Sequence, residues 1–343
     1  MKTKKLNKEI FLIAAFFLVV ILLIALLAKY FWPQKITVQN TEPVPVEKLL
    51  YPQVLNGQLL ADQKATNNFL AFSAMIDNGY DLDSQSGLNQ ASVVYEALAE
   101  SNITRLLAVF SSDIKVERIG PVRSAREYFL DLAQEYGGVF AHVGGSPQAL
   151  AKIADYDFFA LDEMSANGKY FWRDEEYDEP HNVFTSEENI LKLAEKKEVA
   201  NLKTDFQAWN FVKATIFGTA KAQITVDFSS EHYQVDWRYD YDANVYQRWQ
   251  DGVKKLTDQN ATVRATNVII QVAKHSLIDK ERRAIDLKSG GKALVFNKIG
   301  VQEGKWKLVD GRTQFFDANN KPLELLAGTT WVEIVEDISQ VKF

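Results

Sequence analysis

The hydrophobic pattern sets one apolar run at the start of the chain apart from everything that follows. Residues 10–27 (IFLIAAFFLVVILLIALL) contain no charged and no uncharged polar side chain. About 20 apolar residues in a helix cover the ~30 Å hydrocarbon core of a bilayer, so this run predicts a membrane-spanning helix. Four lysines precede it and aromatic residues follow it at positions 30–32, which predicts a cytoplasmic N-terminus. We expect the rest of the chain to be extracytoplasmic, which excludes most nucleotide-driven and DNA-directed chemistry.

A cleaved signal peptide is the alternative interpretation of this run. The apolar core of a signal peptide spans about 7–15 residues and ends at a site with small residues two positions apart. The run here is longer, and Ala28-Lys29-Tyr30 is a poor cleavage site. We therefore favour an uncleaved anchor, with the protein crossing the cell membrane once.

The next segment and the first half of the chain predict a linker and an α/β domain. Residues 33–67 contain four prolines among polar residues, which is typical of an extended linker. Short apolar runs predict buried strands, and apolar positions at helical spacing predict helices. The strands are expected at 69–76, 105–111 and 138–143, and the helices at 91–101, 122–135, from Ser146-Pro147 onward, and at 187–200. Alternating strands and helices indicate an α/β domain over residues 68–203.

The second half has the pattern of a mostly β domain. Alternating or short apolar segments predict strands at 222–228, 233–240, 268–272, 293–296 and 331–335. Asp251-Gly252, Asp310-Gly311 and Asn319-Asn320 are turn signals between such segments. The predicted organisation is a tail and anchor at 1–32, a linker at 33–67, an α/β domain at 68–203 and a mostly β domain at 204–343.

Composition narrows the chemistry further. With 47% hydrophobic and 24% charged residues in 343, the chain has the balance of a globular protein. The net charge is −6, and residues 1–9 carry +3, so the remainder carries −9. This acidity argues against general nucleic-acid binding, which needs clustered cations. The absence of cysteine excludes disulfides, thiolate metal sites, a cysteine nucleophile and attachment through a lipidated cysteine.

The densest candidate for binding chemistry is Gly120-Pro121-Val122-Arg123-Ser124-Ala125-Arg126, with Arg118 just upstream. Pro121 suits the first turn of a helix, and residues three apart in a helix share a face. Arginine forks bind carboxylate or phosphate with two hydrogen bonds. The pattern predicts an anion pocket at a helix start. Local ion pairs with neighbouring carboxylates are the alternative.

A second candidate follows the predicted strand at 138–143. His142 ends that strand, and Gly144 and Gly145 permit a ligand to approach the backbone closely. Ser146 is expected to cap the next helix, whose free N–H groups would face the same edge. His142 is therefore a candidate acid, base or hydrogen-bond donor, with a structural histidine as the alternative. No dinucleotide-binding or Walker motif is present.

A third candidate lies between residues 170 and 183. Arg173 follows three aromatic residues, and His181-Asn182 closes a loop-like stretch. Aromatic rings beside polar donors suit a sugar or peptide ligand. The chain has no HExxH motif and no close histidine pair, so we expect no metal site and no cofactor.

Carboxylates form the fourth candidate. Glu96 and Glu100 are four residues apart on the helix expected at 91–101, and Asp77 ends a predicted strand. Two carboxylates that flank a glycosidic bond make a hydrolase. Like charges on adjacent helical turns also occur on ordinary solvent-exposed faces, which is the alternative. Asp77, Glu96 and His142 are therefore the candidate catalytic residues.

These same stretches resemble the YerB-like lipoprotein family. In the first half the resemblance rests on residues 75–78, 85–97, 103–110, 120–126, 142–147, 171–173 and 180–182. In the second half it rests on residues 239–240, 246–248, 267–271, Trp306, 316–317 and 328–332. The resemblance implies an exported, surface-tethered bacterial protein with paired N- and C-terminal domains, and it supplies no activity. Family members carry a lipid-modified cysteine, whereas this chain has an apolar helix in its place.

The resemblance also unites the candidate residues, because charged side chains fall within its motifs. We expect them to share one polar crevice, since converging polar groups mark binding sites. The predicted ligand-binding residues are Arg105, Arg118, Arg123, Arg126, His142, Gly144, Gly145, Ser146, Arg173, His181 and Asn182.

Three functions follow as hypotheses. The first is a membrane-anchored binding module that holds an anionic group of an envelope polymer or peptide. The second is a hydrolase of envelope glycan or peptide that uses Asp or Glu with His. The third is a scaffold whose β domain docks an envelope protein, which a large exposed apolar patch would support.

Overall fold

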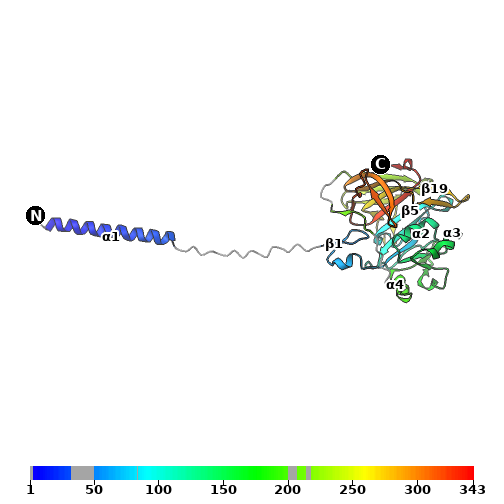
Figure 1. Ribbon diagram of the computed structural model, residues 1–343, viewed down its shortest axis with the longest axis horizontal. Coiled ribbons are helices and arrows are strands. Elements are labelled where there is room, and N and C mark those ends of the chain that lie inside the picture. Colours follow the sequence, from blue (N-terminus) through cyan, green and yellow to red (C-terminus); the bar gives the residue numbers. More distant parts are fainter. Residues whose placement is uncertain (1–2, 32–49, 83, 200–206, 214–217) are drawn as a thin grey trace. The chain divides into compact units, whose positions relative to one another are not determined.

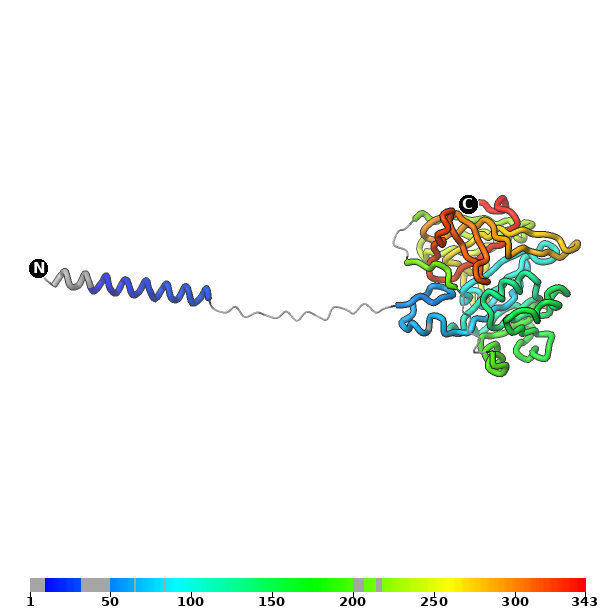
Figure 2. The backbone as a smooth tube through the Cα atoms, viewed as in Figure 1, coloured from blue at the N-terminus to red at the C-terminus, as the bar shows by residue number. Residues whose placement is uncertain are grey.

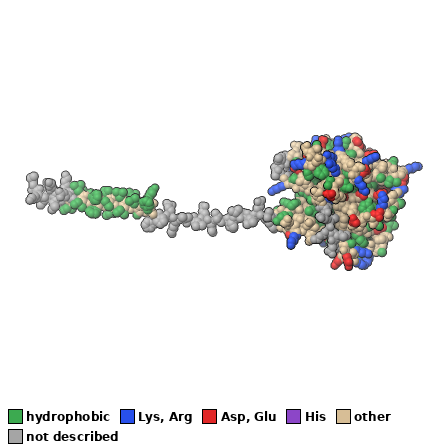
Figure 3. Space-filling model, in the orientation of Figure 1, with side chains coloured by type: hydrophobic (Ala, Val, Ile, Leu, Met, Phe, Trp, Pro, Cys, Tyr) green, Lys and Arg blue, Asp and Glu red, His purple; other side chains and the backbone are tan. Residues whose placement is uncertain are grey.

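The computed structural model describes residues 3–31, 50–82, 84–199, 207–213 and 218–343, which fall into two separate units. The first unit contains helix α1 (Thr3–Phe31), and the most apolar 18 residues of its segment Ile10–Phe31 have a mean hydropathy of 3.5. Hydrophobic side chains cover the coloured part of this helix in Figure 3. The predicted apolar helix is therefore present. By length and composition it is able to cross a membrane, a property that an N-terminal signal sequence shares.

The second unit, called the compact unit below (residues 49–343), is built on a ten-stranded mixed sheet that both halves of the chain supply (Figure 1). In spatial order its strands are β23 (Arg312–Phe316), β22 (Gly300–Val309), β21 (Gly291–Asn297), β18 (Asn267–Val272), β25 (Thr330–Val335), β5 (Val93–Leu98), β6 (Thr104–Ser111), β3 (Ala71–Asp77), β7 (Val139–His142) and β8 (Phe159–Asp162). β25 lies between β18 and β5 and is parallel to both. Figure 2 shows the earlier and later parts of this unit side by side.

A six-stranded antiparallel sheet packs on one face of the large sheet. Its strands are β15 (Val253–Lys254), β14 (Val245–Gln250), β13 (Gln234–Asp240), β12 (Gln223–Asp227) and β26 (Val341–Lys342), with β17 (Arg264–Ala265) beside β14. Trp237 and Val226 from this sheet share a hydrophobic core with Val94, Ala108 and Trp331 from the large sheet. The C-terminal half therefore supplies a β layer as well as half of the central sheet.

Two-stranded pairs complete the β structure. They are β1 (Tyr51–Pro52) with β2 (Leu59–Leu60), β9 (Trp172–Arg173) with β10 (Val183–Phe184), β11 (Phe211–Val212) with β24 (Leu325–Leu326), β4 (Ser84–Gln85) with β16 (Leu256–Thr257), and β19 (Lys274–Leu277) with β20 (Arg283–Asp286). The β4–β16 pair is a further link between the two halves of the chain.

Helices cover the remaining surfaces. The α-helices of the compact unit are α2 (Glu127–Gln134), α3 (Pro147–Lys152) and α4 (Glu187–Lys196). The 3₁₀ turns are η1 (Gln63–Thr66), η2 (Leu88–Gln90), η3 (Glu100–Asn102), η4 (Ile153–Asp155), η5 (Gly168–Tyr170), η6 (Glu231–Tyr233) and η7 (Ile338–Gln340). Phe129 and Leu132 of α2 pack on the sheet face opposite the second sheet, against Met75 and Tyr95. The Oγ atom of Ser146 caps α3 by accepting a hydrogen bond from the backbone N–H of Ala149, as the sequence predicts.

The strands expected from short apolar runs are confirmed, and so is the mixture of α/β and mostly β regions. β3, β6 and β7 occupy the three predicted segments of the first half, and β12, β13, β18, β21 and β25 those of the second. The Asp251-Gly252 and Asp310-Gly311 turns have positive φ at both residues, which suits two-residue hairpin turns.

The helix expected at 91–101 is wrong, because these residues form β5 and η3. All six residues of β5 are buried, because the second sheet packs on one face of the strand and α2 packs on the other, so no alternation of apolar and polar residues survives to identify it. A short apolar run of this kind reads equally as a helix or a buried strand. Glu96 and Glu100 therefore do not share a helix face.

The helix expected at 122–135 begins only at Glu127. Arg126 has extended backbone angles, and the preceding residues form an irregular loop. The backbone N–H groups of Val122 and Arg123 donate to Val183 O and Met75 O, so they bond across segments and not within a helix. Pro121 is not in a helix, and Arg123 and Arg126 do not lie on one helical face.

The segment at residues 50–67 also differs from the extended linker that the sequence predicts. It forms β1, β2 and η1, and it buries Leu55 completely. The Gln53 side chain donates to Ser111 Oγ at 3.1 Å, and Asn56 donates to Ser92 Oγ at 3.2 Å. The segment at residues 50–67, which its prolines predict to be a linker, is thus hydrogen-bonded to the end of β6 and to the start of β5. The first part of the predicted linker, residues 33–49, lies outside the described residues.

Candidate functional site

The loop of residues 118–126, called the arginine loop below, joins three segments that are distant in sequence. Its backbone accepts a hydrogen bond from Asp77 N to Pro121 O at 2.9 Å and donates from Val122 N to Val183 O at 2.7 Å. It also pairs with residues 143–146, through Val143 N to Arg123 O and Ala125 N to Gly144 O, both at 3.0 Å. Backbone bonding therefore brings together the motifs at residues 75–78, 120–126, 142–147 and 180–182.

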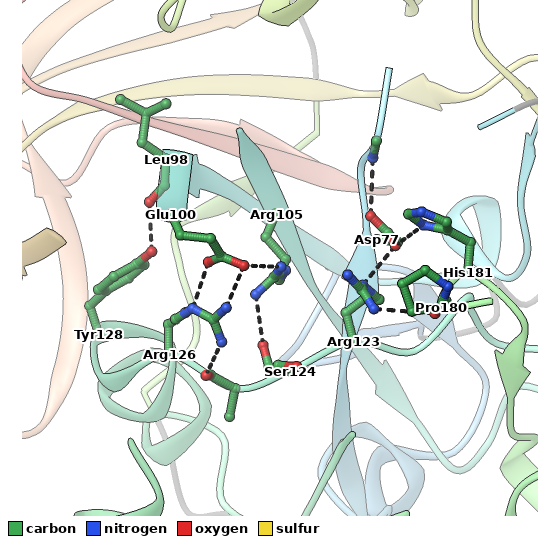
Figure 4. Close-up of polar contacts among 12 residues, drawn as sticks. Asp77, Leu98, Glu100, Arg105, Arg123, Ser124, Arg126, Tyr128, Pro180 and His181 are labelled. Atoms are coloured by element: carbon green, nitrogen blue, oxygen red, sulfur yellow. Dashed lines mark hydrogen bonds and ion pairs between the residues drawn. The ribbon is translucent and has the colours of Figure 1, made fainter. Parts of the chain in front are cut away.

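Glu100 holds the first ion cluster on this loop (Figure 4). Its carboxylate accepts from Arg105 Nη2 at 2.7 Å and from Arg126 Nε at 2.7 Å, and Arg126 Nη2 contacts the same group. Arg105 Nη1 donates to Ser124 O at 3.1 Å, and Arg126 Nη1 donates to Ala125 O at 2.7 Å. Although burial opposes its ionisation, the two guanidinium groups lower the pKa of Glu100 to about 2. Glu100, which sequence analysis treats as a hydrolase candidate, is therefore the partner of two predicted anion-binding arginines.

Asp77 holds the second cluster, beside the first in Figure 4. Its Oδ2 atom lies 2.8 Å from Arg123 Nε and 2.6 Å from His181 Nδ1, and the Arg123 Nη1 donates to Pro180 O at 3.2 Å. Burial opposes ionisation of Asp77, yet the hydrogen bond from His181 and the charge of Arg123 hold its pKa below the ordinary value. The same hydrogen bond raises the pKa of His181. Asp77 thus partners His181, and not the His142 that the sequence places with it.

Glu96 is separated from these clusters by the sheet itself. Asp77 pairs with Arg105 across β3 and β6, whereas Glu96 pairs with Leu106, one position along. Successive strand residues point to opposite faces, so Glu96 faces away from Asp77 and Arg105. It is fully buried and contacts Arg248 Nη2 at 2.7 Å. A catalytic pair of Asp77 and Glu96 is therefore wrong.

His142 and the residues after it have structural partners. His142 is buried, its Nδ1 lies 2.8 Å from Gly144 O, and burial lowers its pKa. The Gly144 N–H donates to Asp162 Oδ1 at 2.8 Å, and Gly144 has a φ of +54°, which favours glycine. Gly145 lies where a Cβ atom would press on Ala125 at 3.3 Å. Gly144 and Gly145 thus allow the backbone at residues 143–146 to pass close to the arginine loop. The α3 helix has only six residues, so its N-terminus is a weak anion site.

Arg118 and Arg173 lie away from the two clusters. Arg118 contacts Asp174 at 2.5 Å, and its guanidinium group stacks 3.8 Å from the centre of the Phe184 ring. Arg173 donates to Asn182 Oδ1 at 2.9 Å and to Glu163 at 3.2 Å. The structure therefore gives every predicted arginine an internal carboxylate partner and does not gather all of them in one crevice.

Three separate pockets are lined by Arg126, His181 and Arg118, respectively. The Arg126 pocket is a narrow slot whose free volume of about 10 Å³ holds about one water molecule. It is lined by Ala99, Glu100, Arg126, Glu127, Tyr128, Ser146, Gln148, Ile278, Arg282 and Arg283. The His181 pocket is an open hollow of about 830 Å³, solvent included, lined by Asp81, Leu82, Glu176, Tyr177, Asp178 and His181. Arg118 lines a third hollow, of about 650 Å³, with Asp258 and Arg264 among its other residues.

The pockets also contain lining residues from the second half of the chain and from an acidic run that the predicted site does not include. Arg282 and Arg283 lie at the tip of the β19–β20 hairpin, and the charged run Asp279-Lys280-Glu281-Arg282-Arg283 is the signal that marks them. Glu176 and Asp178 lie in an acidic run that extends from Asp174 to Glu179. Among the described residues, no group of three or more His, Cys, Asp or Glu side chains is placed to hold a metal ion.

We predict that the histidines titrate in two classes. The pKa values of His181 and His232 are raised by hydrogen bonds to Asp77 and Asp251, whereas burial lowers those of His142 and His275, the last to about 4. NMR titration of the four imidazole rings tests this order. Asp77→Asn is expected to lower the pKa of His181 and leave that of His232 unchanged. A His181 pKa at or below about 6.5 would contradict the Asp77 contact.

The sign of the accompanying stability effect follows from the same shifts. A raised pKa means that the contribution of His181 is complete below its unfolded pKa of about 6.5 and is lost as pH rises through the folded value. The contribution of Asp77 is present above its unfolded pKa of about 3.9 and is lost as pH falls through its lowered folded value. The Asp77–His181 pair therefore stabilises the fold most in mildly acidic solution.

Comparison with known proteins places these features in a family. Two family models match, described as the N-terminal domain of "Protein of unknown function (DUF3048)" at residues 55–200 and its C-terminal domain at residues 224–332. A Bacillus subtilis (strain 168) protein named "Putative lipoprotein YerB" is 36% identical over 322 residues, which cover 88% of this chain and 92% of that protein. The crystal structure of YerB from Bacillus subtilis superposes with a TM-score of 0.76 at 34% identity, covering 85% of this chain and 99% of the other.

Proposed function

This chain belongs to the DUF3048 family, and from that premise we propose that it is a membrane-tethered extracytoplasmic binding module of the cell envelope. The apolar N-terminal helix, the lysines before it and the lipoprotein name of its Bacillus subtilis relative support tethering. The proposed topology has the N-terminus in the cytoplasm and the compact unit outside. In this arrangement the helix takes the place of a lipidated cysteine, which the chain lacks.

The observation that carries the proposed binding site is the convergence of Asp77, Arg123 and His181. Each comes from a different family-like motif, Asp77 contacts both Arg123 and His181, and His181 lines the His181 pocket. Such convergence at an open hollow is what a binding site requires, since the buried network fixes the orientation of the group that faces the ligand. His181 is that group, because its side chain is 29% exposed while Asp77 is 4% exposed.

The charge of this pocket favours a positively charged group on the ligand. Asp81, Glu176 and Asp178 line it and are exposed, whereas the positive charge of Arg123 is already paired with Asp77. The anionic ligand predicted from the arginines has less support here, because a second anion would compete with Glu100 or Asp77. Free ammonium groups of wall peptides or polymers are the class that fits the rim.

Neutralising the rim tests the proposal. In the full chain held in lipid nanodiscs, Glu176→Gln/Asp178→Asn is expected to weaken binding to purified cell-wall material at least tenfold. Wall material whose amines have been acetylated should bind wild type equally weakly. Glu175→Gln is the matched control, because Glu175 is exposed in the same acidic run and does not line the pocket. Binding that survives both acetylation and the double substitution would rule out an ammonium ligand at this pocket.

Arginine substitutions are poor probes of the same site. Removing Arg123 or Arg126 would leave Asp77 or Glu100 without its main partner in a buried or half-buried position. Breaking such pairs destabilises proteins, so lost binding would not separate ligand contact from lost structure.

A second candidate function is hydrolysis, and one observation favours it. Asp77 holds His181 by a 2.6 Å contact to Nδ1, the arrangement in which a carboxylate orients an imidazole that acts as general base. The base would activate water at the His181 pocket. Soluble fragments released from wall material by wild type, lost with His181→Ala and increasing as pH rises through the raised pKa of His181, would favour hydrolysis over binding alone. The third hypothesis, a scaffold whose β region docks an envelope protein, stays a prediction, and identification of such a partner would test it.

A further inference from the structure

The turn between β13 and β14 borders a hollow that the proposed function does not use. The free volume of this hollow is about 340 Å³, which lies within the range of small-molecule sites. It is called the Tyr241 hollow below, and it is lined by Gly218, Thr219, Ala220, Tyr239, Tyr241, Asn244 and Lys298. Within the described residues, none of these lines the pocket of Arg126, of His181 or of Arg118, so the hollow is a separate candidate site.

The Tyr241 hollow lies where the two sheets of the compact unit meet. Tyr241 and Asn244 belong to the turn between β13 and β14 of the second sheet, whereas Lys298 belongs to the turn between β21 and β22 of the large sheet. Gly218 lies so close to the second of these turns that a Cβ atom on it would be 1.6 Å from Ile299 O. Closely packed backbone thus forms part of the wall, as in sites that exist before a ligand binds.

Tyr241 gives the hollow an exposed aromatic face. The residue is 62% exposed, and its ring contacts that of Tyr239 edge to face, with the ring centres 5.0 Å apart. Tyr239 contacts Tyr246 in the same way at 4.9 Å. Exposure falls to 9% at Tyr239 and to 0% at Tyr246. Two buried rings therefore support the exposed ring, and an aromatic side chain held in this way loses little conformational entropy when a ligand binds.

The turn that carries Tyr241 is fixed by its own hydrogen bonds. The Oδ1 atom of Asp240 accepts from the backbone N–H groups of Asp242 and Ala243, both at 3.0 Å. Asn244 has a φ of +56°, in the left-handed region that asparagine adopts more readily than most residues. The ring of Tyr241 and the amide of Asn244 thus come from one ordered turn, which favours precise contact with a ligand.

We propose that the Tyr241 hollow binds a ring of a saccharide. A pyranose ring has an apolar face of C–H groups, which suits an aromatic ring, and hydroxyl groups that both donate and accept hydrogen bonds. Tyr241 would stack on the C–H face, while the Asn244 amide and the Lys298 ammonium group would bind the hydroxyls.

The lining argues against other classes of small ligand. An apolar ligand would take water from the Asn244 amide and the Lys298 ammonium group and give no hydrogen bond in return. A simple anion would not use the ring of Tyr241. None of the described residues that line the hollow carries a carboxylate, so an acidic substituent on the sugar would meet no repulsion from them.

Titration calorimetry with the full chain in nanodiscs tests the proposal. The probes are β-1,4-linked tetrasaccharides of glucose and of N-acetylglucosamine, and a tetrasaccharide of galacturonic acid, which separate neutral, acetamido and acidic sugars. We expect at least one of them to bind wild type. Tyr241→Ala should weaken that binding about tenfold, whereas Tyr241→Phe keeps the ring and should retain the affinity. Asn244→Gly, which permits the positive φ, should also weaken binding.

Tyr80→Ala is the matched control, because Tyr80 is 51% exposed, stacks on the His232 ring and does not line the hollow. It should leave the affinity unchanged, and circular dichroism should show all variants folded. The proposal would be overturned if no sugar bound, if Tyr241→Ala bound as tightly as wild type, or if Tyr241→Phe lost as much affinity as Tyr241→Ala. None of these results would affect the ammonium test, because the Tyr241 hollow and the His181 pocket share no described lining residue.

Discussion

Arg248→Met is expected to destabilise the compact unit by about 3–5 kcal/mol, the usual cost of removing one partner from a buried ion pair. Arg248 lies in β14 and is 1% exposed, and its Nη2 is 2.7 Å from Glu96 Oε2 on β5. Loss of the arginine would leave the carboxylate of Glu96 buried in the core with no cation to offset its desolvation. This loss is a large share of the free energy of unfolding, since domains are stable by only about 5–15 kcal/mol.

The Arg248–Glu96 pair belongs to a wider network of buried hydrogen bonds. Asn78 and Thr104 donate to the other oxygen of Glu96, and Arg248 also donates to Gln250 at 2.9 Å. Glu333 stands directly opposite Glu96 in register and accepts from Trp237 Nε1 at 2.6 Å. The network therefore ties the second sheet to the middle of the large sheet.

Glu333→Gln is the informative companion variant. Complete burial, and then the charge of Glu96 beside it, raise the pKa of Glu333 well above the ordinary value, so its carboxyl holds a proton where exposed glutamates do not. The stability linked to that proton is complete below the unfolded pKa of about 4.3 and is lost as pH rises through the folded value. Glutamine keeps the site neutral, so we expect a small change at neutral pH and less loss of stability in alkaline solution.

Urea unfolding of the three proteins, followed by tryptophan fluorescence across a pH series, measures both effects. A change below about 1 kcal/mol for Arg248→Met would show that the pair contributes little, as exposed pairs do. A large loss for Glu333→Gln at neutral pH would show instead that Glu333 is ionised and needed as an anion.

Removal of residues 328–343 is expected to prevent the compact unit from folding. These residues contain β25, which bridges β18 and β5. All six of its residues are buried, including Trp331, Val332, Ile334 and Val335. Burying each large apolar side chain is worth roughly 1.5–3 kcal/mol, so their loss alone approaches the whole stability of a domain.

A shorter truncation provides the matched control. A chain that ends at residue 336 keeps β25 and loses only η7 and β26, a two-residue strand at the edge of the second sheet. It should fold with reduced stability, whereas the chain that ends at residue 327 should be recovered in aggregates or show no cooperative unfolding by circular dichroism. Cooperative unfolding of the chain that ends at residue 327 would mean that the strands of the first half form a stable sheet without β25.

Local pattern gave the elements correctly where one face of a segment differs from the other. β12, with its alternating pattern, was predictable, as was α3 with its Ser-Pro start. β5 was not, because a strand buried on both faces loses the alternation that identifies it. The helix expected to start at residue 122 was wrong for a related reason. The backbone N–H groups of the arginine loop donate to Met75 and Val183, which are distant in sequence, so the residues near the loop do not reveal these partners.

The candidate site divides in the same way. The motif stretches contained Asp77, Arg123 and His181, but the contacts of Asp77 with the other two depend on the arginine loop and residues 180–182 meeting at the C-terminal end of β3. Glu96 and Asp77 are near in the sheet yet face opposite sides, which depends on a register that sequence alone does not give. Arg282 and Arg283 reach Arg126 only because the hairpin folds over from the other half of the chain.

The sequence by itself determined the apolar N-terminal helix, most of the strands, the family motifs and the absence of cysteine chemistry. Each of these is encoded in residues that are neighbours along the chain. The tertiary structure alone decided that both halves share one sheet, that the predicted arginines are paired with carboxylates, and that Arg126 and His181 line separate pockets. The physical reason is that strand order, register and charge pairing are set by contacts between distant segments, where burial selects partners that local spacing cannot reveal.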